Sequence, residues 1–315
     1  MKVVRSLDEI GKDNSSVVTV GTFDGVHLAH QEIIREVVNR TRMNEGRSVV
    51  VTFEPHPKEI VGRKDQPVHL LTTLEERIRL IGHANVDVLL VISFTFDFSR
   101  LSAREFYLRY VVEGIGVSEV VVGYDHMFGR DRTGGIDELV HMGREFNFSV
   151  SAVHPISVDG EIVSSTRVRR AIATGDVEHA ARLLGHPFEL EGAVVKGDGR
   201  GRTLGYPTAN IQLRSPRKIV PGDGIYLVGV VLRGKRWYGM MSIGVRPTIK
   251  DGGERTIEVH VFGLTDDVYG EALQITFLRR LRDEQKFASV DELVTQMHKD
   301  KETSLRLVAE LEKRK

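Results

Sequence analysis

Two histidines at the start of a predicted helix are the residues of this chain best suited to binding phosphate. Residues 17–20 are β-branched without exception, which predicts a buried strand, and a glycine turn at 21–25 follows. Apolar residues then recur with helical spacing from Ile33. His27 and His30 share one face of the first helical turn, beside free backbone N–H groups at the positive end of the helix dipole. Such an end attracts phosphate, although an ordinary surface pair of histidines has the same spacing.

A second cluster of anion-binding side chains lies in residues 163–170. Ser164, Ser165 and Thr166 bring hydroxyls to the start of another predicted helix, where Arg167, Arg169 and Arg170 follow. One helix cap needs only one hydroxyl. Hydroxyls together with arginines at a helix N-terminus are therefore interpreted as an anion site.

Alternating strands and helices must position these two clusters. Capping boxes predict the starts of two helices, at Thr73 with Glu76 and at Ser102 with Glu105. The further predicted strands of this half are residues 48–53, 86–92, 117–122 and 148–153. Because strands and helices alternate, we expect a doubly wound, mostly parallel sheet.

Two loops after predicted strands are candidates for ligand binding. Residues 54–57 place His56 between two prolines, which forbid a helix and predict an extended loop. Residues 123–135 are rich in glycine and charge, a composition that suits either a functional loop or a mobile connector. Open α/β sheets bind ligands at the carboxyl ends of their strands, where both loops are expected.

The sequence pattern changes at residues 185–187. Downstream, short alternating runs separated by glycine turns replace helical periodicity, and a capping box of Ser289 with Glu292 begins a terminal amphipathic helix. The predicted strands are residues 188–196, 224–232, 236–243, 256–262 and 272–278. We therefore expect a domain boundary after residue 185 and an antiparallel barrel or sandwich beyond it. Glu258 and His260 fall on the face of their strand that is expected to meet water.

Composition excludes several classes of protein. The chain has 315 residues, and Lys plus Arg equals Asp plus Glu at 44 each, so no global field steers it toward nucleic acid or membrane. It has no cysteine, which excludes disulfides, thiolate zinc sites and thiol nucleophiles. Without a signal-peptide pattern or a long apolar run, the cytoplasm is the expected location. Neither a Walker A loop nor a dinucleotide fingerprint occurs. The sequence leaves open whether the chain forms a homo-oligomer.

The motifs of both halves, taken in order, resemble one known family. Residues 21–30 are similar to a nucleotidyltransferase His-x-Gly-His motif, and residues 163–169 to its Ser-Ser-Thr-x-Ile-Arg signature. Further family segments resemble residues 52–57 and the loop around Asp125 in the first half, and residues 204–210, 242–248 and 282–287 in the second. Over nearly its whole length the chain thus looks like a bifunctional bacterial riboflavin kinase and FAD synthetase.

The resemblance implies an α/β plus β-barrel fold with two domains. Residues 1–185 would form a doubly wound, Rossmann-like nucleotidyltransferase domain that adenylylates FMN to FAD. Residues 186–315 would form an antiparallel β-barrel flavokinase domain, with a terminal helix, that phosphorylates riboflavin to FMN. Riboflavin, FMN, FAD and ATP are the implied small-molecule partners, with Mg²⁺ as cofactor and ATP as co-substrate.

The resemblance also implies roles for single residues. In the first domain, His27, His30 and Arg169 would be catalytic. ATP would contact Gly21, Phe23, Asp24, Gly25, His27, His30, Ser164, Ser165, Thr166 and Arg169. FMN would contact Phe53, Pro55, His56, Pro57 and Asp125. In the second domain, Glu258 would be the catalytic base, ATP would contact Gly205, Pro207, Thr208 and Asn210, and the flavin Arg282 and Glu284. Thr208 and Asn210 would also hold the metal ion.

Some residues depart from the family pattern, and two other functions stay open. Ala29 stands where the family has glycine between the histidines, and Ile162 stands where arginine is frequent. The rival readings are a nucleotidyltransferase for another phosphate ester, such as a cytidylyltransferase or pantetheine-phosphate adenylyltransferase, and a flavin-binding regulator without catalysis. The flavokinase-like second half argues against the first, and the retained Glu258, Thr208 and Asn210 argue against the second.

Overall fold

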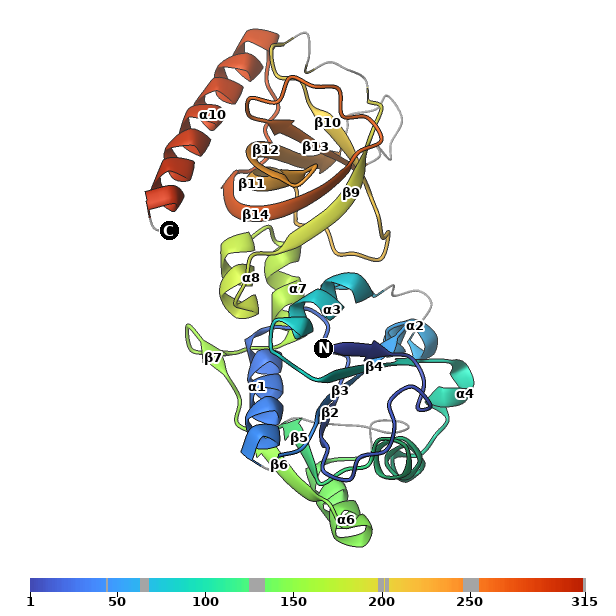
Figure 1. The fold of residues 1–315 in the computed structure, drawn as a ribbon. Coiled ribbons are helices and arrows are strands. Elements are labelled where there is room, and N and C mark those ends of the chain that lie inside the picture. The colour runs from blue at the N-terminus through green and yellow to red at the C-terminus, as the bar shows by residue number, and fades with distance from the viewer. Residues whose placement is uncertain are drawn as a thin grey trace. The chain divides into compact units, whose positions relative to one another are not determined.

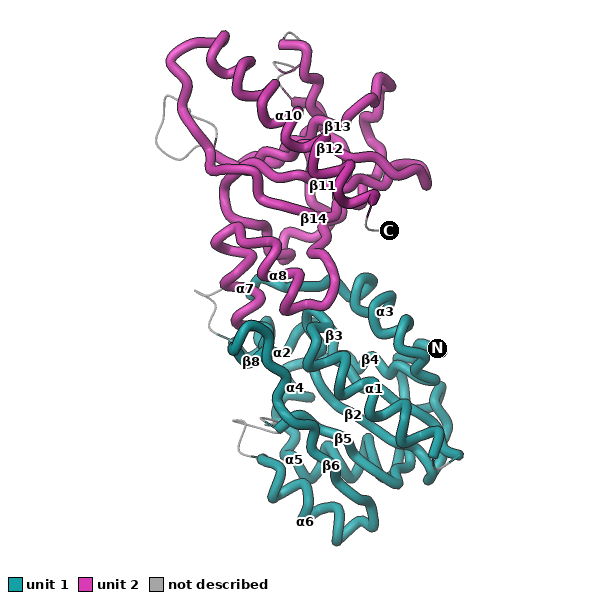
Figure 2. The backbone as a smooth tube through the Cα atoms, turned by 90° about the vertical axis from the view of Figure 1, so that its left-hand side faces the viewer, with its two compact units in different colours: residues 1–165 teal, residues 166–315 magenta. Residues whose placement is uncertain are grey.

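The chain forms two compact units in a computed structural model. The structure describes residues 1–43, 45–62, 68–124, 134–197, 201, 204–245 and 255–313. The first unit is residues 1–165 and the second is residues 166–315 (Figure 2). Within the described ranges, no helix combines the length and the apolar character needed to cross a membrane.

The first unit is built on a parallel sheet, as the sequence predicted (Figure 1). Within the described residues the sheet has six strands in the order β1-β4-β3-β2-β5-β6, and every neighbouring pair is parallel. The strands are β1 (Lys2–Val4), β2 (Val17–Val20), β3 (Ser48–Glu54), β4 (Val88–Ser93), β5 (Glu119–Gly123) and β6 (Ser149–Val153). The chain runs outward from β2 in one direction to β3 and β4, and in the other to β5 and β6. A crevice at the carboxyl ends of β2 and β5 is therefore the expected ligand site.

Helices cover both faces of this sheet. Alternate residues of β3 point to opposite sides, so that Val50 packs with Ile34 and Ile81, whereas Val49 and Val51 pack in a separate core. The helical elements are α1 (Leu28–Met43), α2 (Pro57–Val61), α3 (Leu74–Gly82), α4 (Phe96–Ser99), α5 (Ala103–Phe106), the π-helix η1 (Tyr107–Ile115) and α6 (Ile136–Phe146). A short hairpin of β7 (Ser157–Val158) and β8 (Glu161–Ile162) follows. The capping boxes at Thr73 and Ser102 both form, as predicted.

The second unit is a closed antiparallel barrel with helices at both ends of its chain. Helices α7 (Ser165–Ala173) and α8 (Val177–Leu184) precede the barrel, and α10 (Val290–Lys313) follows it. In the described part of the chain the barrel order is β10-β13-β12-β11-β14-β9. The strands are β9 (Glu189–Val195), β10 (Ala209–Leu213), β11 (Gly224–Leu232), β12 (Lys235–Val245), β13 (Arg255–Val261) and β14 (Ala272–Arg282).

The structure corrects two expectations about single elements. Residues 54–57 were expected to exclude a helix, yet α2 begins at Pro57, because proline is well suited to the first helical position, where its missing N–H has no intrahelical partner. Residues 209–213 were not predicted as a strand, yet they form β10. This strand pairs with both β9 and β13 and so closes the barrel.

The compact units divide at residues 165 and 166, twenty residues before the boundary expected from sequence at 185. The helices between these two points pack with the barrel. Arg280 of β14 donates from Nη1 to the carbonyl of Thr174 at 2.9 Å and from its backbone N–H to Glu178 Oε2 at 3.1 Å. By their contacts, α8 and the part of α7 from residue 166 belong to the second unit. By their helical periodicity alone, the sequence assigned them to the α/β half.

Candidate active sites

The turn after β2 brings the two histidines together at the start of α1. Phe23, Gly25 and Val26 have positive φ angles of 48°, 87° and 41°, which fold residues 21–27 into a tight turn. The rings of His27 and His30 stack with centroids 3.6 Å apart, and His27 Nδ1 accepts a hydrogen bond from the His30 backbone N–H at 3.4 Å. The i, i+3 spacing therefore places both imidazoles on one face, as predicted.

Asp24 holds this turn through its buried carboxylate. The carboxylate accepts hydrogen bonds from the backbone N–H groups of Leu71 and Thr72 at 2.9 Å each. The backbone carbonyl of Asp24 accepts a hydrogen bond from Ser165 Oγ at 3.1 Å. One hydroxyl of the predicted anion cluster thus lies at the histidine turn. Thr166 and Arg169 belong to α7 in the second unit, and their place at this site stays a prediction.

The predicted flavin segment after β3 is bordered by aromatic rings. Phe53 lies 5.6 Å from Phe94 and 5.9 Å from Phe98, measured between ring centroids. His56 is buried and caps α2, because its Nδ1 accepts a hydrogen bond from the Lys58 backbone N–H at 3.2 Å. Asp125, the remaining predicted flavin residue of this unit, lies outside the described residues.

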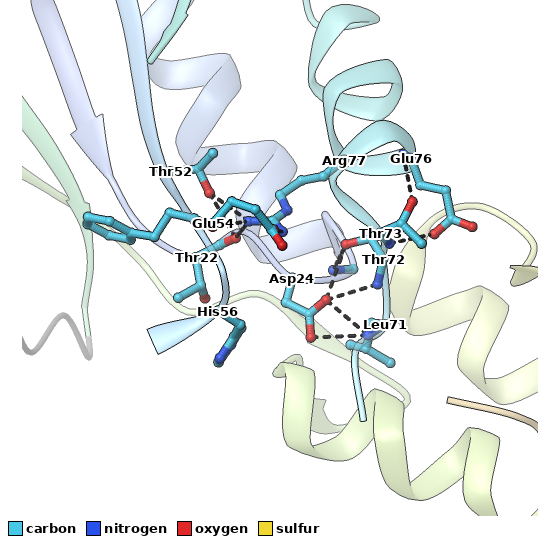
Figure 3. A network of polar contacts seen from close by, with 12 residues as sticks. Thr22, Asp24, Thr52, Glu54, His56, Leu71, Thr72, Thr73, Glu76 and Arg77 are labelled. Atoms are coloured by element: carbon cyan, nitrogen blue, oxygen red, sulfur yellow. Dashed lines mark hydrogen bonds and ion pairs between the residues drawn. The ribbon is translucent and has the colours of Figure 1, made fainter. Parts of the chain in front are cut away.

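Arg77 is a residue of this region that sequence reasoning missed. It is fully buried, and its Nη1 donates to the carbonyls of Thr22 at 2.9 Å and Phe53 at 3.0 Å and to Thr52 Oγ1 at 2.9 Å. Its Nη2 pairs with Glu54 at 3.1 Å (Figure 3). Burial lowers the pKa of Arg77, and the nearby carboxylates of Asp24 and Glu54 oppose this shift.

A sequence signal for Arg77 does exist. It lies three residues after Leu74 and four before Ile81, on the apolar stripe that α3 turns toward the core. A buried arginine needs compensating acceptors. Its position therefore implied polar partners, although the sequence did not say which.

In the second unit the structure brings three predicted kinase residues together. Asn210 of β10 is directly opposite Glu258 of β13 in the strand register. Thr208 Oγ1, just before β10, donates a hydrogen bond to Glu258 Oε2 at 3.1 Å. A Cβ on Gly197 would lie 1.9 Å from Asn210 Nδ2, so only glycine fits beside this amide as it now stands.

Residues 204–208, the segment before β10, are held by a backbone hydrogen bond to Gly201 and by a side-chain hydrogen bond to α10. The N–H of Tyr206 donates to the carbonyl of Gly201 at 2.8 Å, and Gly205 has a φ of 78°. The Tyr206 hydroxyl and Nδ1 of His298 on α10 are hydrogen-bonded at 2.6 Å. His260 Nδ1 donates to the carbonyl of Pro207 at 2.9 Å.

His260 is buried, whereas the sequence placed it on a face that meets water. The rings of Tyr206 and Phe262 cover it, with centroids 5.1 and 5.7 Å away. The alternation within β13 could not predict that His260 is buried, because Tyr206, one of the two rings that cover it, belongs to a distant part of the sequence. Burial lowers the pKa of His260, and the hydrogen bond to Pro207 opposes this shift.

The two predicted flavin residues of the barrel lie where β14 ends. A Cβ on Gly244 would lie 1.9 Å from Glu284 Oε1, so this carboxylate packs directly against the backbone of β12. Burial raises the pKa of Glu284 and the Asp223 carboxylate adds to the shift, whereas Arg282 and a hydrogen bond with Ser242 oppose it. Ser242 is directly opposite Glu258 in the strand register. Glu284 therefore reaches β12, the strand that pairs with the one carrying the predicted base Glu258.

Among the described residues, no group of three or more His, Cys, Asp or Glu could hold a metal ion. Hard oxygen donors are nevertheless present together, from the Thr208 hydroxyl, the Asn210 amide and the Glu258 carboxylate. Mg²⁺ characteristically takes one or two protein ligands and completes its shell with substrate phosphates and water. The donor set fits this ion.

Comparison with known proteins decides the family. A model of FAD synthetase matches residues 9–167, and a model of riboflavin kinase matches residues 184–308. A bifunctional riboflavin kinase/FMN adenylyltransferase of Pseudomonas fluorescens is 40% identical over 95% of this chain and 96% of its own length. The chain belongs to the bifunctional riboflavin kinase/FMN adenylyltransferase family.

Other members of the riboflavin kinase/FMN adenylyltransferase family match equally completely. The Escherichia coli K12 protein of the same description is 36% identical over 96% of this chain and 97% of its own length. A crystal structure described as a macrolide-efflux protein from Streptococcus pneumoniae has a TM-score of 0.85 and 36% identity. It covers 96% of this chain and 98% of its own, and its description concerns the pneumococcal protein alone.

Proposed function

We propose that the chain catalyses two consecutive reactions of flavin cofactor synthesis. The C-terminal domain, residues 186–315, phosphorylates riboflavin with ATP to give FMN, and the N-terminal domain, residues 1–185, adenylylates FMN with a second ATP to give FAD and pyrophosphate. The observation that carries the proposal is the match of both family models to one chain, together with full-length relatives described by both activities. We keep residue 185 as the boundary between the catalytic domains, because the riboflavin kinase match begins at residue 184.

In the kinase step Glu258 acts as the general base. A ribityl hydroxyl of riboflavin attacks the γ-phosphorus of ATP, the bond from that phosphorus to the β-phosphate oxygen breaks, and the hydroxyl proton passes to the Glu258 carboxylate. The hydrogen bond from Thr208 orients this carboxylate. Arg282 and Glu284 contact the flavin, and Gly205 and Pro207 line the path of the nucleotide.

Thr208 and Asn210 are the proposed ligands of Mg²⁺. When bound, this ion would neutralise charge on the ATP phosphates. The same two residues contact the phosphates themselves, and the absence of a side chain at Gly197 leaves room for the Asn210 amide.

In the adenylyl transfer step the FMN phosphate is already a nucleophile, so no general base is required. The protein must position two anions and stabilise charge on the α-phosphate and the leaving pyrophosphate. We assign this role to His27, His30 and Arg169 as catalytic residues. The remaining ATP contacts are Gly21, Phe23, Gly25, Ser164, Ser165 and Thr166, and the FMN contacts are Phe53, Pro55, His56, Pro57 and Asp125.

Asp24 has a modified role in this proposal. Its carboxylate accepts hydrogen bonds from the backbone at residues 71–72 and would repel a triphosphate. We therefore assign Asp24 to holding the turn in which ATP binds, so that only its backbone faces the nucleotide.

The test is product analysis with the purified chain. Riboflavin, ATP and Mg²⁺ are expected to give FMN first and FAD afterwards on a chromatogram. Riboflavin returned unchanged would contradict the kinase assignment, and FMN that accumulates without FAD would contradict the transferase assignment. A regulator that only binds flavin would return riboflavin unchanged while quenching its fluorescence.

A further inference from the structure

Helix α10 places a buried carboxylate behind Arg282, the last residue of β14. Asp300 Oδ2 accepts hydrogen bonds from Arg282 Nη2 at 2.7 Å and from Nε at 2.9 Å, and Oδ1 lies 3.1 Å from the same Nε. The two side chains are only 15% and 8% exposed. A bidentate pair of this kind fixes the plane of a guanidinium as well as its position.

Neighbouring groups hold both partners of this pair. Gln296, one turn earlier on α10, donates from Nε2 to Asp300 Oδ1 at 2.8 Å. Arg282 Nη1 donates to the carbonyl of Asp283 at 2.9 Å. The guanidinium therefore has its orientation set before any ligand arrives, which reduces the conformational entropy lost when it contacts one.

The pair lies at the proposed flavin face of the barrel. Arg282 is close enough to Glu284 to lower the pKa of its carboxylate, and Glu284 bonds to Ser242 opposite Glu258. The same helix also contacts the proposed nucleotide segment, through the hydrogen bond between His298 and Tyr206. Helix α10 thus contacts both parts of the kinase site from one side.

We propose that Asp300 is a positioning residue of the riboflavin kinase site, which acts by fixing Arg282 in the orientation that contacts the flavin. The proposal rests on the proposed kinase function. An ion pair that served stability alone would change the unfolding of the barrel and leave riboflavin binding as it is. Asp300 instead affects the Michaelis constant for riboflavin, because a misdirected guanidinium weakens the contact with the flavin.

The test is steady-state kinetics of full-length Asp300→Asn, with Glu310→Gln as a control that removes an exposed carboxylate from the same helix. Asp300→Asn is expected to raise the KM for riboflavin about tenfold. The KM for ATP, and the conversion of FMN to FAD, are expected to stay within about twofold of the wild type. Glu310→Gln is expected to change none of these, and Asp300→Glu, which keeps the charge, to recover part of the loss.

A double variant shows whether Asp300 acts through Arg282. In an Arg282→Ala background, Asp300→Asn is expected to raise the KM for riboflavin no further. An equal rise in both backgrounds overturns the proposal. If Asp300→Asn does not fold, Gln296→Leu, which removes only the hydrogen bond to Asp300, is expected to raise the KM for riboflavin about threefold. An unchanged KM in that variant also overturns the proposal.

The proposed function and this inference fail in different ways. A wild-type chain that does not phosphorylate riboflavin overturns the kinase function and the role of Asp300 with it. A wild-type chain that makes FMN, together with an Asp300→Asn variant whose KM for riboflavin is unchanged, overturns only the role of Asp300.

Discussion

Arg77 and Asp24 link the turn after β2 to the segment around the start of α3, and each segment supplies one of the two charged side chains. Arg77 of α3 donates to the carbonyl of Thr22 in the segment that follows β2. Asp24 of the turn after β2 accepts hydrogen bonds from the backbone just before α3 (Figure 3). The histidine turn and the end of β3 are therefore held by charges that do not need to touch a substrate.

Replacement of Arg77 is expected to disrupt the first unit far more than replacement of its exposed neighbour Arg79. Arg77→Gln leaves buried acceptors and Glu54 without their cation, so the free energy of unfolding of this unit should fall by about 3 kcal/mol. Arg79→Gln should change it by less than about 0.5 kcal/mol. Urea unfolding and the rate of FAD formation from FMN measure both effects. Equal losses in the two variants would show that Arg77 is not a structural link.

The sequence predicts residues whose partners are local and misses those whose partners are distant. His27 and His30 are three residues apart, so helical geometry alone places their rings together. The acceptors of Arg77 lie 23 to 55 residues away in the chain. Only the packing of α3 against two strand ends brings them to its guanidinium.

At the scale of elements, one strand was missed although its residue pattern fits a strand. β10 alternates apolar Ala209, Ile211 and Leu213 with polar Asn210 and Gln212, but the glycine-rich stretch of residues 197–210 was interpreted as a loop. It is the strand that supplies Asn210 to the proposed kinase site and closes the barrel. The terminal helix was predicted as amphipathic, a pattern that does not show which of its charged residues are buried. Asp300 is buried, and its charge is paired with that of Arg282.

The contact between β13 and the segment before β10 is expected to depend on pH. Neutral His260 donates to Pro207, and burial lowers its pKa from 6.5. A lowered folded-state pKa gives a stabilising contribution that is complete above the unfolded-state value and is lost as pH falls through the lowered value. The unfolding temperature of the second unit should therefore drop between about pH 7 and about pH 5, and less so in His260→Gln. An equal drop in the two proteins would exclude His260 as the cause.

At the scale of the whole molecule, two folds in one chain correspond to two successive reactions. The alternation of strands and helices predicted the first fold, and the loss of helical periodicity after residue 185 predicted the second. The family models match the two halves separately. The compact units divide earlier, because α8 and most of α7 pack against the barrel. Periodicity shows that a helix has an apolar face, but it does not show which core that face joins.

The division of labour between the halves follows from the chemistry of the two nucleophiles. The ribityl hydroxyl of riboflavin must lose a proton, and Glu258, the proposed base, lies beside Thr208 and Asn210. The phosphate of FMN has no proton to lose at neutral pH beyond those it has already released. A substitution that removes only the base should therefore separate the two reactions.

The kinetics of Glu258→Gln test this account most directly. The amide preserves the shape of the side chain and can still accept the hydrogen bond from Thr208, but it cannot take a proton. FMN formation from riboflavin should fall about a hundredfold or more, whereas conversion of supplied FMN to FAD should stay within about twofold of the wild type. A folded Glu258→Gln variant that loses both reactions equally, or that keeps riboflavin phosphorylation at the wild-type rate, would contradict the assignment of one reaction to each half.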